Sequence, residues 1–164
     1  MILLGLGGNL ASPEHGSPQA TLSAALAALP ALRVCVAERS SWYRSEPVPR
    51  SDQPWYVNAV AALRTALDPA CLLASLLALE TRFGRMRGAP NAARVLDLDL
   101  LDYDGQVIES DTLRLPHPRL HLRRFVLAPL VELAPLWRHP VSGLTATELL
   151  GGLPPGEPVL RIAE

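Results

Sequence analysis

Lysine is absent from this 164-residue sequence, so all 15 basic side chains are arginines. A phosphate-binding loop, a Schiff base or a general base built on lysine is therefore excluded. Aromatic residues are also scarce, at 5% of the chain, and the formal net charge is only −1. Because binding to a nucleic-acid backbone needs an excess of basic charge, we expect no nucleic-acid partner.

Cysteines and long hydrophobic runs are equally sparse. Cys35 and Cys71 each lie among apolar residues, so we expect two buried thiols of a reduced protein rather than a disulfide. The apolar stretch at residues 1–8 lacks a basic flank and is too short for a signal peptide or a membrane span. We therefore expect a cytoplasmic protein with no membrane partner.

The residues that are present fit a single domain spanning residues 1–164, because nearly half of them are apolar. The pattern predicts strands at residues 1–6, 33–43, 55–64, 95–103 and 106–108. It predicts helices at residues 18–29, 69–83, 120–133 and 146–150. Two strand–helix–strand units in this order predict an α+β, ferredoxin-like fold, in which helices pack on both faces of a four-stranded antiparallel sheet in three αβα layers.

Two carboxylates, Asp97 and Asp99, lie two residues apart on the predicted strand 95–103. Residues i and i+2 of a strand share a face, so both carboxylates point one way while the intervening leucines point into the core. Oxygen ligands on a rigid strand suit Mg²⁺, which takes its other ligands from water and phosphates. A solvated acidic face is the alternative interpretation.

Arginines cluster around this acidic pair in the sequence. Eight of the 15 flank it: Arg82, Arg85, Arg87, Arg94, Arg114, Arg119, Arg123 and Arg124. Phosphoryl transfer needs carboxylates to hold metal and guanidinium groups to neutralise phosphate charge. Each arginine alone fits a surface position equally well, so the inference depends on the cluster.

A second group of residues is suited to a flat heterocycle. Tyr56 and Asn58 share one face of the predicted strand 55–64, which places an aromatic plane beside an amide. Core packing is the alternative for Tyr56. His117 lies between two prolines, where a structural role is the alternative to a phosphate contact. No Cys/His cluster has the spacing of zinc ligands, which argues against a zinc site.

In order and spacing, these segments resemble the 6-hydroxymethyl-7,8-dihydropterin pyrophosphokinase family of folate biosynthesis, from residue 1 to about residue 135. The motifs that carry the resemblance are GLGGNL (residues 5–10), YRSEPV (43–48), DQPWYVNA (52–59), ETRFGR (80–85), RVLDLDL (94–100), PHPR (116–119) and RRF (123–125). Each motif alone is modest, but the ordered set is specific.

The resemblance implies an enzyme that moves an intact diphosphate from ATP to 6-hydroxymethyl-7,8-dihydropterin, with attack at the β-phosphorus and AMP leaving. Separately, we expect the protein to be a monomer. It implies that Asp97 and Asp99 hold two Mg²⁺ ions and that Arg85 and Arg94 are catalytic. The residues it implies for ATP are Glu80, Arg87, His117 and Arg123. Those it implies for the pterin are Gly7, Ser45, Glu46, Val48, Tyr56, Asn58 and Phe125, with the two aromatic rings stacking on the pterin.

The chain departs from the family pattern in the loop before the acidic strand. Family members carry Arg-Trp-Gly-Pro-Arg there, whereas residues 91–94 read Asn-Ala-Ala-Arg, one residue shorter. Because loop closure gates such sites, a catalytically impaired homologue is one alternative. The others are a ferredoxin-like ligand-binding module, for instance for RNA, and a phosphohydrolase that uses the same aspartates.

Overall fold

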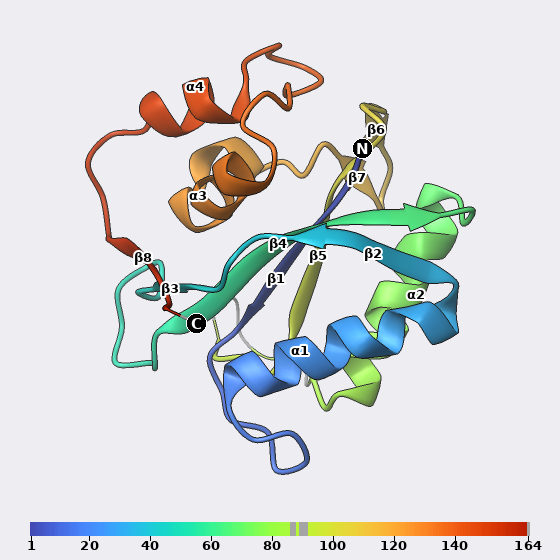
Figure 1. Cartoon of the computed structure of the whole chain (residues 1–164), viewed down its shortest axis with the longest axis vertical. Helices are drawn as coiled ribbons and strands as arrows, with labels where there is room; N and C mark the ends of the chain where they lie inside the picture. Colours follow the sequence, from blue (N-terminus) through green and yellow to red (C-terminus); the bar gives the residue numbers. More distant parts are fainter. Residues whose placement is uncertain (86–87, 89–91, 164) are drawn as a thin grey trace.

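The computed structural model describes residues 1–85, 88 and 92–163, and Figure 1 shows how their helices and strands are arranged. The main sheet consists of β1 (Ile2–Gly8), β2 (Val34–Arg39), β3 (Tyr43–Ser45), β4 (Tyr56–Thr65), β5 (Asp97–Tyr103) and β8 (Val159–Arg161). Its order is β5-β1-β4-β3-β8, and β2 also pairs with β4. All these pairs are antiparallel. A second small sheet joins β6 (Ile108–Glu109) to β7 (Arg114–Leu115).

The four α-helices of the described chain are α1 (Pro18–Ala28), α2 (Pro69–Arg82), α3 (Arg124–Leu133) and α4 (Ala146–Gly151). Short 3-10 turns at Leu29–Leu32 and Leu120–Leu122 follow α1 and precede α3. Helix starts follow the sequence closely: the Asp68 carboxylate accepts the Cys71 N–H, and Pro69 occupies the first turn of α2. Within the described ranges, none of the helices is both long and apolar enough to span a membrane.

Alternating side chains of the central strands contribute to two hydrophobic cores, one on each side of the sheet. Leu4 of β1 packs with α1 and α2, whereas its neighbour Leu3 packs with α3 and α4. Leu98 of β5 is buried in the first core, as its alternation with two acidic residues predicts. Asp97 and Asp99 therefore project from the other face of the sheet, the face that α3 and α4 cover.

The mixed α and β composition and the antiparallel sheet are as predicted, but the sheet has six strands rather than four. The predicted strand 33–43 is two strands, β2 and β3, which pair with opposite ends of β4. The predicted strand 106–108 overlaps β6 only at Ile108, and β6 pairs with β7. β8 was not predicted, because a three-residue edge strand carries almost no periodic signal.

The prediction of buried thiols was wrong, because Cys35 and Cys71 are both exposed. Cys35 alternates on β2 with the buried Val34 and so points away from the core. Cys71 lies in the first turn of α2, on the side of the helix opposite its buried leucines. Apolar neighbours in the sequence did not reveal which way either side chain points.

Candidate active site

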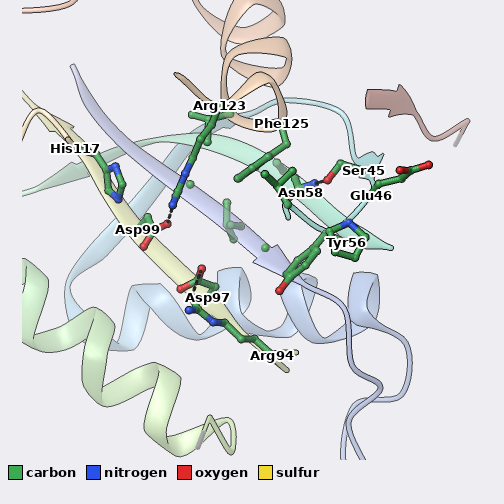
Figure 2. A pocket seen from close by; sticks show the side chains of 17 residues that line it. Ser45, Glu46, Tyr56, Asn58, Arg94, Asp97, Asp99, His117, Arg123 and Phe125 are labelled. Atoms are coloured by element: carbon green, nitrogen blue, oxygen red, sulfur yellow. Dashed lines mark hydrogen bonds and ion pairs between the residues drawn. The ribbon is translucent and has the colours of Figure 1, made fainter. Parts of the chain in front are cut away.

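A cavity of about 270 Å³ lies over β1, β4 and β5, between the sheet and the start of α3 (Figure 2). Its lining comprises Gly5, Leu6, Gly7, Ser45, Glu46, Pro47, Val48, Tyr56, Asn58, Ala59, Arg94, Asp97, Asp99, His117, Arg123, Phe125 and Val126. All seven residues expected for the pterin are among them; we call these the acceptor half. After the role that the resemblance predicts for them, we call the remaining polar lining residues, with the Arg85 and Glu80 side chains next to Asp97, the nucleotide half; its lining members are Arg94, Asp97, Asp99, His117 and Arg123.

Backbone pairing brings the acceptor half together. Gly7 lies opposite Asn58, and Ser45 lies opposite Tyr56. The Asn58 side chain is buried, and its Nδ2 donates a hydrogen bond of 2.7 Å to Ser45 Oγ. A Cβ added to Gly7 would lie 3.3 Å from Asn58 Oδ1, so glycine at this position leaves room for the amide. Asn58 therefore presents an oriented amide edge to the cavity.

Two aromatic side chains reach the cavity from different elements. Tyr56 comes from the start of β4 and Phe125 from the first turn of α3, as Figure 2 shows. The Arg123 guanidinium lies 5.5 Å from the centre of the Phe125 ring, within range of a cation–π contact. Burial raises the pKa of Tyr56 above its ordinary value, so its ring stays neutral and is suited to stacking.

The two aspartates lie opposite glycines of β1: Gly7 faces Asp97, and Gly5 faces Asp99. Directly opposed residues of an antiparallel pair point to the same face. Because the glycines have no side chains, the space next to both carboxylates stays open toward the cavity. Sequence reasoning missed Gly5 as a site residue. The pattern that could have revealed it is that Gly5 and Gly7 lie two residues apart, the same spacing as Asp97 and Asp99.

Arginines hold Asp97 on both sides. Arg85 Nη1 lies 2.9 Å from Oδ1, and Arg94 Nη1 lies 2.9 Å from Oδ2. Arg85 also pairs with the buried Glu80, whose carboxylate accepts the Leu98 N–H at 2.8 Å. Burial raises the pKa of Glu80, although the Leu98 N–H and the charge of Arg85 oppose this. Neither Glu80 nor Arg85 lines the cavity; Arg85 bonds Asp97 directly, and Glu80 bonds Arg85.

The loop that carries Arg94 is attached to the end of β1. Asn9 accepts the Arg94 N–H through Oδ1 at 2.8 Å, and its Nδ2 donates to the Pro54 carbonyl at 3.0 Å. Gly8 has no room for a side chain, because a Cβ there would lie 2.6 Å from the Val95 carbonyl oxygen. These contacts fix the backbone from which the Arg94 side chain reaches Asp97.

Asp99 is electrostatically different from its neighbour. Its nearest described cation is Arg123, with Nη1 3.9 Å from Oδ2. Burial, and next the charge of Asp97, raise the pKa of Asp99 to about 7. About a third of its side-chain surface is accessible, and Asp99 lines the open cavity. A carboxylate placed in this way gains from a bound cation.

The donor set fits a magnesium ion. Asp97 and Asp99 supply hard oxygen ligands next to the open cavity, and within the described part of the chain no three His, Cys, Asp or Glu side chains converge on one point. A metal at this position would therefore take its other ligands from water and a substrate. This is the usual way in which Mg²⁺ binds together with phosphates.

His117 lies on the same wall as Asp99 (Figure 2). Burial, helped by the charge of Arg123, lowers its pKa to about 4, so the ring is neutral at physiological pH. Its Nδ1 accepts the Arg119 N–H at 3.1 Å, which leaves the ring proton on Nε2. His117 thus supplies a neutral hydrogen-bond donor rather than a cation.

The structure does not bring all the flanking arginines together. Arg82, Arg114, Arg119 and Arg124 lie outside the cavity lining, and Arg87 lies outside the described residues. Lining residues missed by sequence reasoning are Gly5, Leu6, Ala59 and Val126. Apart from Gly5 they are small or apolar residues, each next to a predicted site residue or a glycine, and have no chemical signal of their own.

Comparison with known proteins identifies the family of the chain. The model of the family described as 7,8-dihydro-6-hydroxymethylpterin-pyrophosphokinase matches residues 3–135. A 2-amino-4-hydroxy-6-hydroxymethyldihydropteridine pyrophosphokinase of Synechocystis is 42% identical over 149 residues, which cover 90% of this chain and 73% of that protein. Proteins of the same name from Methylorubrum extorquens and Pseudomonas aeruginosa are 40% and 41% identical, over 93% of this chain and 92% and 91% of their own length. The chain therefore belongs to the 7,8-dihydro-6-hydroxymethylpterin-pyrophosphokinase family.

Proposed function

We propose that this chain transfers the diphosphoryl group of ATP to 6-hydroxymethyl-7,8-dihydropterin, giving AMP and the pterin diphosphate in folate biosynthesis. The observation that carries the proposal is that one cavity contains both an amide-and-aromatic acceptor half and an acidic pair surrounded by arginines. A phosphohydrolase would need only the second of these, and a pterin-binding module only the first.

The acceptor half would recognise the flat ring by shape and by its polar edge. Tyr56 and Phe125 offer aromatic surface, and the Asn58 amide, oriented by Ser45, offers both an acceptor and a donor. Gly7, Glu46 and Val48 complete the wall. Holding the acceptor hydroxymethyl group next to the phosphates would supply much of the rate enhancement, because a bimolecular reaction becomes effectively unimolecular.

In the nucleotide half, Asp97 and Asp99 would hold Mg²⁺, two ions by the family resemblance. Magnesium bound there neutralises phosphate charge and makes the acceptor hydroxyl easier to deprotonate. Arg85 and Arg94 have further N–H groups beyond those bonded to carboxylates, which suit phosphate oxygens. Glu80 would keep Arg85 in place, Arg123 and neutral His117 would contact the nucleotide, and Arg87 would join them. No side-chain general base is assigned.

Several broader expectations belong to the same proposal. We propose that β5, β1, β4 and β2, with α1 and α2, form a ferredoxin-like core, and that β3, β8, α3 and α4 add a third layer and an extended edge; the pairing of β1 with β5 and β4, and of β2 with β4, supports this. We propose a single domain over residues 1–164 that acts as a cytoplasmic monomer on small molecules and not on nucleic acid.

The test is to incubate purified protein with ATP, Mg²⁺ and 6-hydroxymethyl-7,8-dihydropterin, and to quantify AMP, pterin diphosphate and inorganic phosphate together. Equal amounts of AMP and pterin diphosphate, both lost in Asp97→Ala and Asp99→Ala proteins, support the proposal. Release of inorganic phosphate without pterin would instead identify a phosphohydrolase. Pterin binding without AMP would identify an impaired homologue, and displacement of bound pterin by single-stranded RNA would identify an RNA-binding module.

A further inference from the structure

The wall of the acceptor half lies between two hollows of the molecule. A second hollow of about 270 Å³ adjoins the first, and both are lined by Ser45, Glu46, Val48, Arg123 and Phe125. The C-terminal residues 153–157 and 159 also line the second hollow. Side chains between two hollows make fewer packing contacts than side chains in a close-packed core. Another element must therefore fix the wall.

One such element is the C-terminal strand β8, which lies beyond the residues that the family model matches. It pairs with β3, so that Val159 lies opposite Ser45 and Arg161 opposite Tyr43. Figure 1 shows β8 beside β3 at the edge of the sheet. β3, which contains the Ser45 that orients Asn58, is thus paired on both sides, by β4 and by β8.

The second element is the Glu132 carboxylate in the last turn of α3. Its Oε1 accepts hydrogen bonds from the Ser41 N–H at 2.9 Å and from Ser41 Oγ at 2.8 Å. Its Oε2 accepts one from the Tyr43 hydroxyl. Burial acts to raise the pKa of Glu132, but these hydrogen bonds and the charge of Arg161 outweigh burial and lower it. Glu132 is therefore charged and ties α3 to the chain around β3.

This bond joins the two parts of the acceptor wall. Phe125 lies seven residues before Glu132 on the same helix, about 10 Å along its axis, with Pro129 between them. Tyr43 lies two residues before Ser45 on β3. Fixing Glu132 to Tyr43 and Ser41 therefore fixes the distance between the Phe125 ring and the Ser45–Asn58 pair. Neither Glu132 nor Tyr43 lines the cavity, so neither would touch the substrate.

We propose that β8 and the Glu132–Ser41–Tyr43 hydrogen bonds, together called the brace, position the acceptor half and thereby set the affinity for the pterin. This inference rests on the proposed function, because it names the ligand of the acceptor half. The brace residues are positioning residues. The carboxylates of the nucleotide half lie on β5, and the ion pairs that hold Asp97 come from Arg85 and Arg94, outside the brace.

The experiment compares two ways of weakening the brace. Glu132→Ala removes the carboxylate, and Glu38→Ala, an exposed glutamate on β2, is its matched control. Leu160→Pro removes a backbone donor of β8. Every second N–H group of a strand in an antiparallel pair points toward the same neighbouring strand. The Ile162 N–H donates to the Trp42 carbonyl next to β3, so the Leu160 N–H, two residues earlier, also points toward β3. Leu160→Ala changes the same half-exposed side chain and keeps the N–H.

Dissociation constants are measured by calorimetry for 6-hydroxymethyl-7,8-dihydropterin and, separately, for a non-hydrolysable ATP analogue with Mg²⁺. Glu132→Ala and Leu160→Pro should weaken pterin binding about tenfold, the size expected from losing one hydrogen bond to a charged group. The Kd for the nucleotide should change by less than about twofold, which is well below the tenfold change expected for the pterin. Glu132→Gln, which keeps the shape and one acceptor oxygen, should restore most of the pterin affinity. Both control variants should bind like the wild type.

A purely structural role gives a different result. The brace proposal is wrong if pterin and nucleotide binding fall together, in proportion to the fraction of protein that is folded in a thermal melt. It is also wrong if pterin binding does not change. Should Leu160→Pro fail to fold, Tyr43→Phe with Glu132→Ala decides the question in the same way. If the wild type binds pterin and the variants bind it equally well, the brace proposal is wrong but the proposed function is not affected. A wild type that binds no pterin overturns the proposed function as well.

Discussion

The two halves of the cavity are held together by different forces. In the acceptor half, residues from β1, β3 and β4 are brought together by backbone ladders, and neutral groups such as Asn58 and Ser45 bond each other. In the nucleotide half, Asp97 is held by ion pairs to Arg85 and Arg94 within 12 residues of chain. The first arrangement depends on shape, and the second depends on charge.

This difference predicts which kinds of change should affect each half. Neutral hydrogen bonds and aromatic packing change little with pH between 5 and 8, so the acceptor half should respond mainly to changes of volume. A carboxylate with a raised pKa and a set of guanidinium groups should respond to pH, metal concentration and charge removal. Variants that separate pterin affinity from catalysis therefore test the comparison directly.

The largest effect should come from removing a carboxylate of the nucleotide half. Asp99→Ala should lower kcat by on the order of a thousandfold, the scale seen when a preorganised electrostatic group is lost from an active site. Pterin affinity should stay within about threefold of the wild type, because Asn58 and Phe125 remain in place. Steady-state kinetics with calorimetry separates the two quantities. A matching loss of pterin affinity would mean that the halves are not independent.

Removing the aromatic ring from the acceptor half should have the reverse effect. Phe125→Ala should weaken pterin binding by about 10- to 100-fold, since stacking of a base on an aromatic side chain contributes about 1–3 kcal/mol. Leu122→Ala, a change at a largely exposed side chain nearby, is the control. Binding of the ATP analogue should be unaffected by either change. Equal affinity of both variants for the pterin would contradict stacking by Phe125.

The sequence predicted the two halves unequally, and the reason is physical. Asp97 and Asp99 alternate with leucines, so strand geometry alone places them side by side, and Asp68 with Pro69 marks the start of α2. In the acceptor half, strand geometry predicted that Tyr56 and Asn58 share a face, but the other residues were predicted only by the family resemblance, because they come from distant segments. Nothing in residues 159–161 or at Glu132 indicates their partners, since those contacts span about 90 residues or more.

The pH dependence of the metal requirement should show the charged nature of the nucleotide half. The pKa of Asp99 is raised to about 7, and a metal ligand must lose its proton. The Mg²⁺ concentration for half-maximal activity should therefore rise as the pH falls below about 7, by up to about tenfold per pH unit. Activity titrations with Mg²⁺ at pH 6 and pH 8 measure this. A half-maximal concentration independent of pH would show that Asp99 is ionised throughout.

The same raised pKa makes a prediction about stability. The folded protein holds a proton on Asp99 that the unfolded chain releases near its ordinary value of 3.8, so the native state binds more protons between pH 4 and 7. Stability contributed by Asp99 in metal-free protein should therefore fall as the pH rises through this range. Asp99→Asn should unfold at a higher denaturant concentration than the wild type at pH 8 but not at pH 4. Equal differences at both pH values would contradict the assigned pKa.

The smallest effect concerns the space beside Asn58. Gly7→Ala would place a Cβ 3.3 Å from Asn58 Oδ1, so the amide must move by a few tenths of an ångström. We expect pterin affinity to fall about three- to fivefold, less than for loss of a full hydrogen bond. Gly151→Ala, where a Cβ meets open space, is the matched control. An unchanged pterin Kd for Gly7→Ala would mean that the amide is not held in the orientation described.

The central claim is that both halves act in one reaction, the transfer of an intact diphosphate. The most direct test uses ATP labelled in its β- and γ-phosphates together with 6-hydroxymethyl-7,8-dihydropterin and Mg²⁺, with products separated by chromatography. The account predicts that both labels appear together in the pterin product, in an amount equal to the unlabelled AMP. Label in inorganic phosphate, ADP or a pterin monophosphate would contradict it.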